Sequence, residues 1–444
     1  MKKLLPILAF IMMLISVPSL SKADEPTIYP NVVNVSVYKA TSLTLTLTNT
    51  YQLSNNDTGL TTPIPANSVV TVKNNGTAIE ISFTGVTQTS STGFKVQELP
   101  NILPSIAALS NGISYRGSFS FVKNGSYVGV TNYLDMEDYL KGVVPSEMPA
   151  SWPKEALKAQ AIAARSYAET SMGLTSTPSS QVYRGYTGED SRSNAAIKET
   201  EGLMAEFAGK PIMAFFFSTS GGQTANYGDV WNGAYAKPYY VSVADPFEVS
   251  PNSTWTETFP ASTLLKSFGF TDTTTKLLDA SLKATGANGE VSGVTVKTSA
   301  GDKTITGDEG VIRKLFPTTK ASHYYEIDSN WFTMTVSKAA APTDLSVQTT
   351  TGIEAVTDLN GQTVQTASGV VTLDGSDVSI QTSTGVVSSS GTPGTGEVTS
   401  VTLNGKGWGH RIGMSQYGAK GYAEQGWTAE QIIQHYFQGT TVSR

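Results

Sequence analysis

The stretch that decides the fold reads Trp152-Pro-Lys-Glu-Ala-Leu-Lys-Ala-Gln-Ala-Ile-Ala-Ala-Arg-Ser-Tyr167. Its residues are strong helix formers, and Pro153 stands where a first helical turn tolerates proline. We therefore predict a helix from about Trp152 to Met172. Because alanines lie on nearly every face of this helix, we expect protein to surround it.

The segment before this helix predicts β-structure. Between Asn31 and Gln97 the chain alternates, as in Leu43-Thr-Leu-Thr-Leu-Thr48, and Asn-Asn, Asn-Gly and Pro separate the runs. This pattern indicates short antiparallel strands. We interpret the strands as scaffold, and glycan binding is the alternative.

The segments after the central helix alternate between helix and strand. Helices are predicted over Ser193–Glu201, near Ala261–Phe268, and after Thr428, which forms a capping-box pattern with Gln431. A dense aromatic strand is predicted over Pro211–Ser218.

A weak internal repeat marks residues 343–398, which carry little charge. Its units are Gln348-Thr-Thr-Thr-Gly352, Gln365-Thr-Ala-Ser-Gly369 and Gln381-Thr-Ser-Thr-Gly385, spaced by 17 and then 16 residues. That spacing predicts about one hairpin per unit. We interpret the region as a β-rich insertion.

Together these patterns predict an α+β protein. Its mixed α/β core would contain the central Ala-rich helix. The expected divisions are a signal peptide (1–23), a β-rich N-terminal region (24–100), a catalytic domain (101–338 and 399–444) and a β-rich insertion (339–398).

The N-terminus has the pattern of an export signal. Lys2-Lys3 precede an apolar run from Leu4 to Leu20, and Ser21-Lys22-Ala23 suits signal peptidase. We therefore expect a secreted or cell-wall-associated protein, with an uncleaved membrane anchor as the alternative.

Charge and cysteine content exclude several classes of function. Removing residues 1–23 takes away three of 30 basic residues and none of 36 acidic ones, so 27 − 36 gives a net charge of −9. We therefore expect no nucleic-acid partner. The chain has no cysteine and three histidines, so we expect no metal site and no other cofactor.

Glu147 is the first candidate for chemistry. It lies in Val143-Val-Pro-Ser-Glu-Met-Pro149, between two prolines and next to Met148. Apolar neighbours raise the pKa of a carboxyl group by desolvating its anion, so such a glutamate can act as a general acid. A solvated carboxylate on a surface loop is the alternative.

Two cations on the central helix are further candidates. Lys158 and Arg165 are seven residues apart and so share one stripe of the helix. They would orient Glu147 or bind substrate oxygens, and ordinary solvation is the alternative.

The third candidate is the glycine-rich stretch Gly407-Trp-Gly-His-Arg-Ile-Gly-Met-Ser-Gln-Tyr-Gly418. Glycines let a backbone approach a ligand closely. Aromatic and polar side chains among them can stack on sugar rings and form hydrogen bonds with them. A tight structural turn is one alternative, and a Ser/His/Asp triad that uses His410 is another, although no nucleophile elbow is present.

These motifs together resemble the stage II sporulation protein D / amidase-enhancer (SpoIID/LytB) family. The resemblance rests on Tyr139-Leu-Lys-Gly-Val-Val-Pro-Ser-Glu-Met-Pro149, the central helix, Phe217-Ser-Thr-Ser-Gly-Gly222 and the glycine-rich stretch. It covers roughly residues 113–245 and 401–442, and it is weaker over 251–333.

The resemblance implies a lytic transglycosylase that cleaves peptidoglycan between N-acetylmuramic acid and N-acetylglucosamine and leaves an anhydro-muramic end. By this resemblance Glu147 is the catalytic acid/base. The residues implied in substrate binding are Lys158, Arg165, Ser220, Gly221, His410, Ser415, Gln416 and Tyr417. Arg411 replaces the small residue that the family usually has after the motif histidine, which is expected to alter binding at a subsite.

The implied partners are peptidoglycan glycan strands, with a cell-wall amidase as a candidate second partner. Two other functions stay open. One is a non-catalytic enhancer of an N-acetylmuramoyl-L-alanine amidase, and the other is a structural β-rich surface protein.

Overall fold

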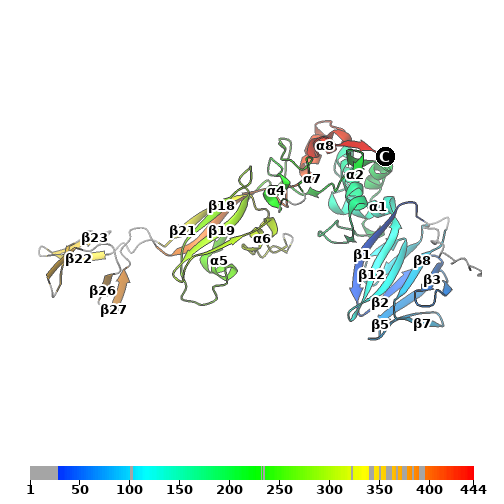
Figure 1. Cartoon of the computed structure of the whole chain (residues 1–444), viewed down its shortest axis with the longest axis horizontal. Coiled ribbons are helices and arrows are strands. Elements are labelled where there is room, and N and C mark those ends of the chain that lie inside the picture. The colour runs from blue at the N-terminus through cyan, green and yellow to red at the C-terminus, as the bar shows by residue number, and fades with distance from the viewer. Residues whose placement is uncertain are drawn as a thin grey trace, which may run out of the picture.

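The computed structural model describes residues 29–100, 104–231, 233, 236–321, 324–339 and 396–444, together with strands between 345 and 389. Figure 1 shows an elongated chain in which a helical part lies between two β-rich parts. This arrangement confirms the predicted α+β class. Within the described ranges, no helix is both long and apolar enough to span a membrane. The expected signal peptide lies outside those ranges.

The N-terminal part consists of a seven-stranded and a six-stranded sheet that share one core. Their orders are β13-β1-β12-β11-β8-β3-β4 and β10-β9-β2-β5-β6-β7. The strands are β1 (Val32–Ala40), β2 (Ser42–Leu47), β3 (Tyr51–Asn55), β4 (Thr61–Ile64), β5 (Val69–Asn74), β6 (Ile79–Phe83), β7 (Val86–Ser90), β8 (Phe94–Glu98), β9 (Ile106–Leu109), β10 (Ser114–Arg116), β11 (Ser118–Asn124), β12 (Tyr127–Asp135) and β13 (Leu174–Thr175). Because β8 pairs with β11, the sheets continue beyond residue 100 and reach Asp135.

The helical part follows directly from β12. Its helices are α1 (Met136–Glu147), α2 (Lys154–Thr170), a 3-10 turn η1 (Tyr186–Gly188), α3 (Ser191–Glu199), α4 (Tyr227–Val230), α7 (Gln416–Glu424) and α8 (Ala429–Tyr436). Small sheets join it, formed by β14 (Met204–Phe207), β15 (Lys210–Pro211) and β30 (Thr441–Ser443), and by β16 (Phe216–Phe217) with β29 (Met414–Ser415).

The predicted central helix is α2, and protein surrounds it as expected. It packs against α1, α3, α7 and α8, and residues on all of its faces are buried, from Ala156 to Ala168. Small alanines allow these neighbours to approach closely. The capping box at Thr428 is also present at the start of α8.

One predicted strand is wrong. Of Pro211–Ser218, only Pro211 and Phe216–Phe217 pair as strand, and the chain turns where the Phe215 N–H donates to the Met213 carbonyl (3.0 Å). The rings of Phe215 and Phe217 instead make edge-to-face contacts, Phe215 with Tyr167 and Trp231, and Phe217 with His410.

A second β-rich part, here called the appended module, comprises residues 254–338 and 398–406 and has its own apolar core. Its elements are β17 (Thr254–Pro260), α5 (Ala261–Ser267), β18 (Leu277–Ala284), β19 (Val291–Thr298), β20 (Lys303–Thr306), α6 (Glu309–Lys314), β21 (Phe332–Lys338) and β28 (Val398–Lys406). They form the sheets β17-β28-β21 and β18-β19-β20.

Each of the three repeat units forms one hairpin, as predicted. The strands are β22 (Leu345–Thr349) with β23 (Gly352–Val356), β24 (Thr363–Thr366) with β25 (Gly369–Thr372), and β26 (Val378–Thr382) with β27 (Gly385–Ser389). In every pair the first strand ends on the Gln-Thr of the repeat and the second begins at its glycine.

Candidate active site

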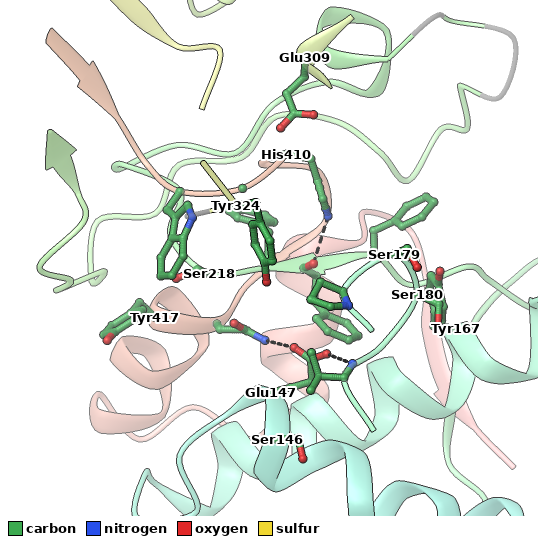
Figure 2. A pocket seen from close by; sticks show the side chains of 18 of the residues that line it. Ser146, Glu147, Tyr167, Ser179, Ser180, Ser218, Glu309, Tyr324, His410 and Tyr417 are labelled. Atoms are coloured by element: carbon green, nitrogen blue, oxygen red, sulfur yellow. Dashed lines mark hydrogen bonds between the residues drawn. The ribbon is translucent and has the colours of Figure 1, made fainter. Parts of the chain in front are cut away.

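A cleft of about 610 Å³ lies between the helical part and the appended module (Figure 2). Much of its wall is aromatic. Residues that line it include Ser146, Glu147, Trp152, Tyr167, Val182, Arg184, Phe215, Phe216, Phe217, Trp231, Glu309, Arg313, Tyr324, Trp408, His410, Gln416 and Tyr417. A concave site in which aromatic walls meet a set of polar and charged side chains is typical of ligand binding.

Glu147 is the last residue of α1, where it faces the cleft (Figure 2). The helix ends there because Met148 is extended before Pro149, as steric contact with a proline ring requires. One carboxylate oxygen, Oε1, accepts a hydrogen bond from the Val182 N–H (2.6 Å), and Oε2 accepts one from Gln416 Nε2 (3.4 Å). The carboxylate is therefore fixed from two sides.

The surroundings of Glu147 suit proton transfer. Burial raises the pKa of this carboxyl group from 4.5 to about 7, against the lowering effect of its hydrogen bonds to Val182 and Gln416. A pKa near neutrality allows one group to donate a proton and then to take one back. Because Glu147 ends a helix and both of its carboxylate oxygens accept hydrogen bonds, it is not the solvated loop carboxylate of the alternative interpretation.

Glu309 is the only other carboxylate among the described residues that line the cleft. It lies in the appended module, across the cleft from Glu147 (Figure 2), and forms an ion pair with Arg313 (2.5 Å). The Glu309 carboxylate is therefore already engaged by a cation, on the wall of the cleft opposite Glu147.

A buried hydrogen-bond network positions Gln416. Ser415 is the N-cap of α7, and its hydroxyl donates to the Glu248 carboxylate (2.8 Å). The same carboxylate accepts the backbone N–H groups of Ser220 and Gly221. Ser220, Gly221 and Ser415 thus lie behind the cleft wall rather than in it, and they fix the start of the helix that carries Gln416.

The glycines of the two motifs allow their backbones to cross. Thr219 and Trp408 exchange backbone hydrogen bonds of 3.1 and 2.8 Å. At Gly221 (φ +75°) a Cβ would lie 2.7 Å from the Gly407 nitrogen, and at Gly407 (φ +75°) it would lie 2.7 Å from the Thr219 carbonyl. Only glycine fits both positions.

His410 lines the cleft but is not poised as a base. Its Nδ1 accepts the Ile412 N–H (3.1 Å), so Nε2 carries the proton and donates to the Phe216 carbonyl (3.1 Å). Burial lowers the pKa of His410 to about 3, against the effect of the Phe216 carbonyl. Because both ring nitrogens are engaged, the alternative of a triad built on His410 is wrong.

Tyr417 forms an aromatic platform with Trp152 at the same cleft. The two rings meet edge to face with centroids 4.8 Å apart. Both side chains line the cleft and are partly exposed. Aromatic faces of this kind suit the apolar faces of sugar rings.

Neither Lys158 nor Arg165 lines the cleft, so the structure gives neither side chain a contact with Glu147 and does not support the expectation that they bind substrate oxygens there. Lys158 pairs with Glu155 (2.9 Å) and Glu199 (2.7 Å). Arg165 is 2% exposed and binds both carboxylate oxygens of Glu137, at 2.8 and 2.7 Å, through Nε and Nη2. Its partner belongs to α1, the helix that carries Glu147, so Arg165 holds that helix against α2.

Arg411 does not reach the cleft either. Its side chain is fully buried, pairs with Glu290 (3.1 Å) and donates to the carbonyls of Ser220 (3.1 Å) and Gln223 (2.9 Å). The guanidinium also lies 4.0 Å from the Trp331 ring centroid. Because Glu290 and Trp331 belong to the appended module, Arg411 joins that module to the helical part instead of forming a subsite.

Comparisons with known proteins find relatives of the segment that contains Glu147. A family model described as "Stage II sporulation protein" matches residues 124–207, which contain Glu147, α2 and α3. With the relatives below, this match shows that the chain belongs to the stage II sporulation protein D / amidase-enhancer family.

Two kinds of relative are similar to the chain. An amidase enhancer of Bacillus subtilis (strain 168) is 32% identical over 318 residues, which cover 68% of this chain and 40% of that protein. Stage II sporulation protein D of the same organism is 28% identical over 335 residues, which cover 70% of this chain and 75% of that protein. That of Bacillus amyloliquefaciens is 28% identical over 333 residues, 70% of this chain and 74% of the relative.

Proposed function

We propose that this protein is a secreted peptidoglycan lytic transglycosylase that cleaves the bond between N-acetylmuramic acid and N-acetylglucosamine, with Glu147 as the acid/base. The observation that carries the proposal is the carboxyl group of Glu147. It lies in an aromatic cleft, is fixed by two hydrogen bonds, and has a pKa raised to about 7 by burial.

The reaction needs one carboxyl group and no added water. Protonated Glu147 gives its proton to the glycosidic oxygen as the bond to the muramic anomeric carbon breaks. The muramic C6 hydroxyl oxygen then bonds to that carbon, and its proton passes to the Glu147 carboxylate. The enzyme returns to its starting state, and the products are an anhydro-muramic end and a free N-acetylglucosamine hydroxyl.

The ion pair formed by the second carboxylate of the cleft supports this route over hydrolysis. Hydrolysing glycosidases usually place two carboxyl groups about 5 to 10 Å apart, on either side of the scissile bond. Here the second carboxylate of the cleft, Glu309, is paired with Arg313 on the opposite wall. Among the described residues that line the cleft, Glu147 is then the one carboxylate that no cation engages.

The test is product analysis by mass spectrometry after purified residues 24–444 meet peptidoglycan, both intact and stripped of its peptides by an amidase. We expect anhydro-muramic ends from the wild type and none from Glu147→Gln. Glu169→Gln is the matched control, because it makes the same change on an exposed face of α2. Anhydro ends from Glu147→Gln at the wild-type rate would contradict the assignment.

A second candidate function is enhancement of a separate cell-wall amidase. It is favoured by the relative named amidase enhancer, which aligns with 68% of this chain. Amidase activity measured with and without this protein separates the two functions. Enhancement that survives in Glu147→Gln, together with no glycan cleavage by the wild type, would favour the enhancer.

The remaining assignments of the proposal concern location and layout. We assign the apolar segment before residue 24 to export and residues 339–398 to an insertion outside the catalytic unit. Among the implied substrate residues, His410, Gln416 and Tyr417 line the cleft and are proposed to contact the glycan. Ser220, Gly221 and Ser415 are proposed to act through the position of Gln416.

A further inference from the structure

Two neighbouring tyrosines of the appended module have an unusual backbone. Tyr324 and Tyr325 adopt φ values of +57° and +63°, a region that side chains with a Cβ rarely occupy. Hydrogen bonds hold this turn, from the Tyr325 N–H to Lys320 O (3.1 Å) and from the Thr318 N–H to Tyr325 O (2.8 Å). Strained turns of this kind persist where the surroundings enforce them, and they cluster at functional sites.

Burial does not explain the strain. The two tyrosines are 56% and 60% exposed, so neither ring contributes much apolar area to the core of the module. Packing in the core therefore does not account for this turn, and backbone strain that packing does not account for is found at ligand-binding sites.

The two rings differ in where they lie. Tyr324 lines the same cleft as Glu147, and Figure 2 shows both side chains. Partial burial raises the pKa of the Tyr324 hydroxyl, and the negative charge of Glu147 raises it further. Tyr325 is not among the residues that line the cleft.

The joint between the module and the helical part holds Tyr324 in place. Besides the buried pair of Arg411 with Glu290, the Gly409 N–H donates to the Asp328 carbonyl (2.9 Å) and Trp255 Nε1 donates to the Gly407 carbonyl (3.1 Å). These bonds connect the module directly to the glycine-rich stretch that forms the cleft wall. The turn that carries Tyr324 therefore belongs to a module whose position relative to Trp152 and Tyr417 is fixed by these bonds.

We propose that Tyr324 is a substrate-stacking residue, through which the appended module covers one pyranose ring of the glycan strand next to the bond held at Glu147. The sugar would lie between Tyr324 and the aromatic side chains of the helical part. The C–H groups of a pyranose face carry a slight positive charge, which the negative face of a tyrosine ring attracts. This inference rests on the proposed function, because it takes the cleft as a glycan site.

The test measures binding without turnover, by isothermal titration calorimetry in the Glu147→Gln parent. The probe is a peptide-free tetrasaccharide of alternating N-acetylglucosamine and N-acetylmuramic acid. We expect Tyr324→Gly to raise Kd about tenfold, the size of one aromatic contact. Tyr324→Phe keeps the ring and should bind within about twofold of the parent.

Tyr325→Gly is the matched control, because it relieves the same kind of backbone strain but removes a ring outside the cleft. Equal Kd values for the parent and Tyr324→Gly would overturn the inference, as would an equal loss in Tyr325→Gly. A parent that does not bind the tetrasaccharide would contradict the substrate class, and the inference with it. If the parent binds the tetrasaccharide and Tyr324→Gly binds it equally well, only the role of Tyr324 is contradicted and the substrate class stands.

Discussion

Replacement of Glu147 by glutamine should stabilise the protein above neutral pH while it removes activity. In the folded protein the pKa of this carboxyl group is raised from 4.5 to about 7 because burial disfavours its anion. One pKa unit corresponds to about 1.4 kcal/mol, so keeping Glu147 ionised in the fold costs on the order of 3 kcal/mol. Glutamine has a similar shape and no charge.

The sign of the pH dependence follows from proton binding. Between about pH 4.5 and about pH 7 the folded protein binds a proton at Glu147 that the unfolded chain has released, so wild-type stability falls as pH rises through this window. The variant lacks this loss. Relative to the wild type, Glu147→Gln should therefore gain on the order of 3 kcal/mol between about pH 4 and about pH 8.

Chemical denaturation of both proteins at a series of pH values measures this difference. Asp245 is a second buried acid whose pKa is raised to about 7 by burial and by nearby Glu248, but it is present in both proteins and cancels. A stability difference between wild type and Glu147→Gln that stays the same from acid to alkaline pH would contradict a raised pKa for Glu147. It would mean that Glu147 is not desolvated in the fold.

Three further predictions follow from the contacts around the cleft. Gln416→Ala removes a hydrogen bond that lowers the pKa of Glu147, so the alkaline limb of the rate profile, near pH 7 in the wild type, should move to higher pH; an unmoved limb would exclude this contact. Arg411→Gln leaves Glu290 buried without its cation and should destabilise the protein by about 3 to 5 kcal/mol in denaturant unfolding; a loss below about 1 kcal/mol would show that the joint is solvated. Arg165→Lys breaks the bidentate ion pair with Glu137, so it should lower the melting temperature and leave Kd for the glycan unchanged. A larger Kd at an unchanged melting temperature would show instead that Arg165 takes part in glycan binding.

Local patterns in the sequence predicted the elements whose cause is local. The Ala-rich composition of α2, the capping box of α8 and the repeat of the hairpins each depend on residues within a few positions of one another. The same reasoning missed α1, although Asp135 caps it by accepting the Glu137 N–H. The sequence did contain a helix-start signal, because Asp135 can act as an N-cap and two acidic residues, Glu137 and Asp138, follow in the first turn.

Partners distant in the chain decided the rest. The spacing of Lys158 and Arg165 placed them on one stripe, but their carboxylate partners determine that this stripe faces protein rather than the cleft. Arg411 pairs with Glu290, 121 positions away. Periodicity along one segment contains no information on such contacts, and for the same reason Glu248 and Tyr324 were not anticipated.

Cleavage of peptidoglycan in water labelled with a heavy oxygen isotope distinguishes an internal attack directed by Glu147 from hydrolysis. We expect anhydro-muramic ends without heavy oxygen from the wild type, and no new ends from Glu147→Gln. New reducing ends that carry the heavy oxygen would contradict an internal attack, because a water molecule would then have attacked the anomeric carbon.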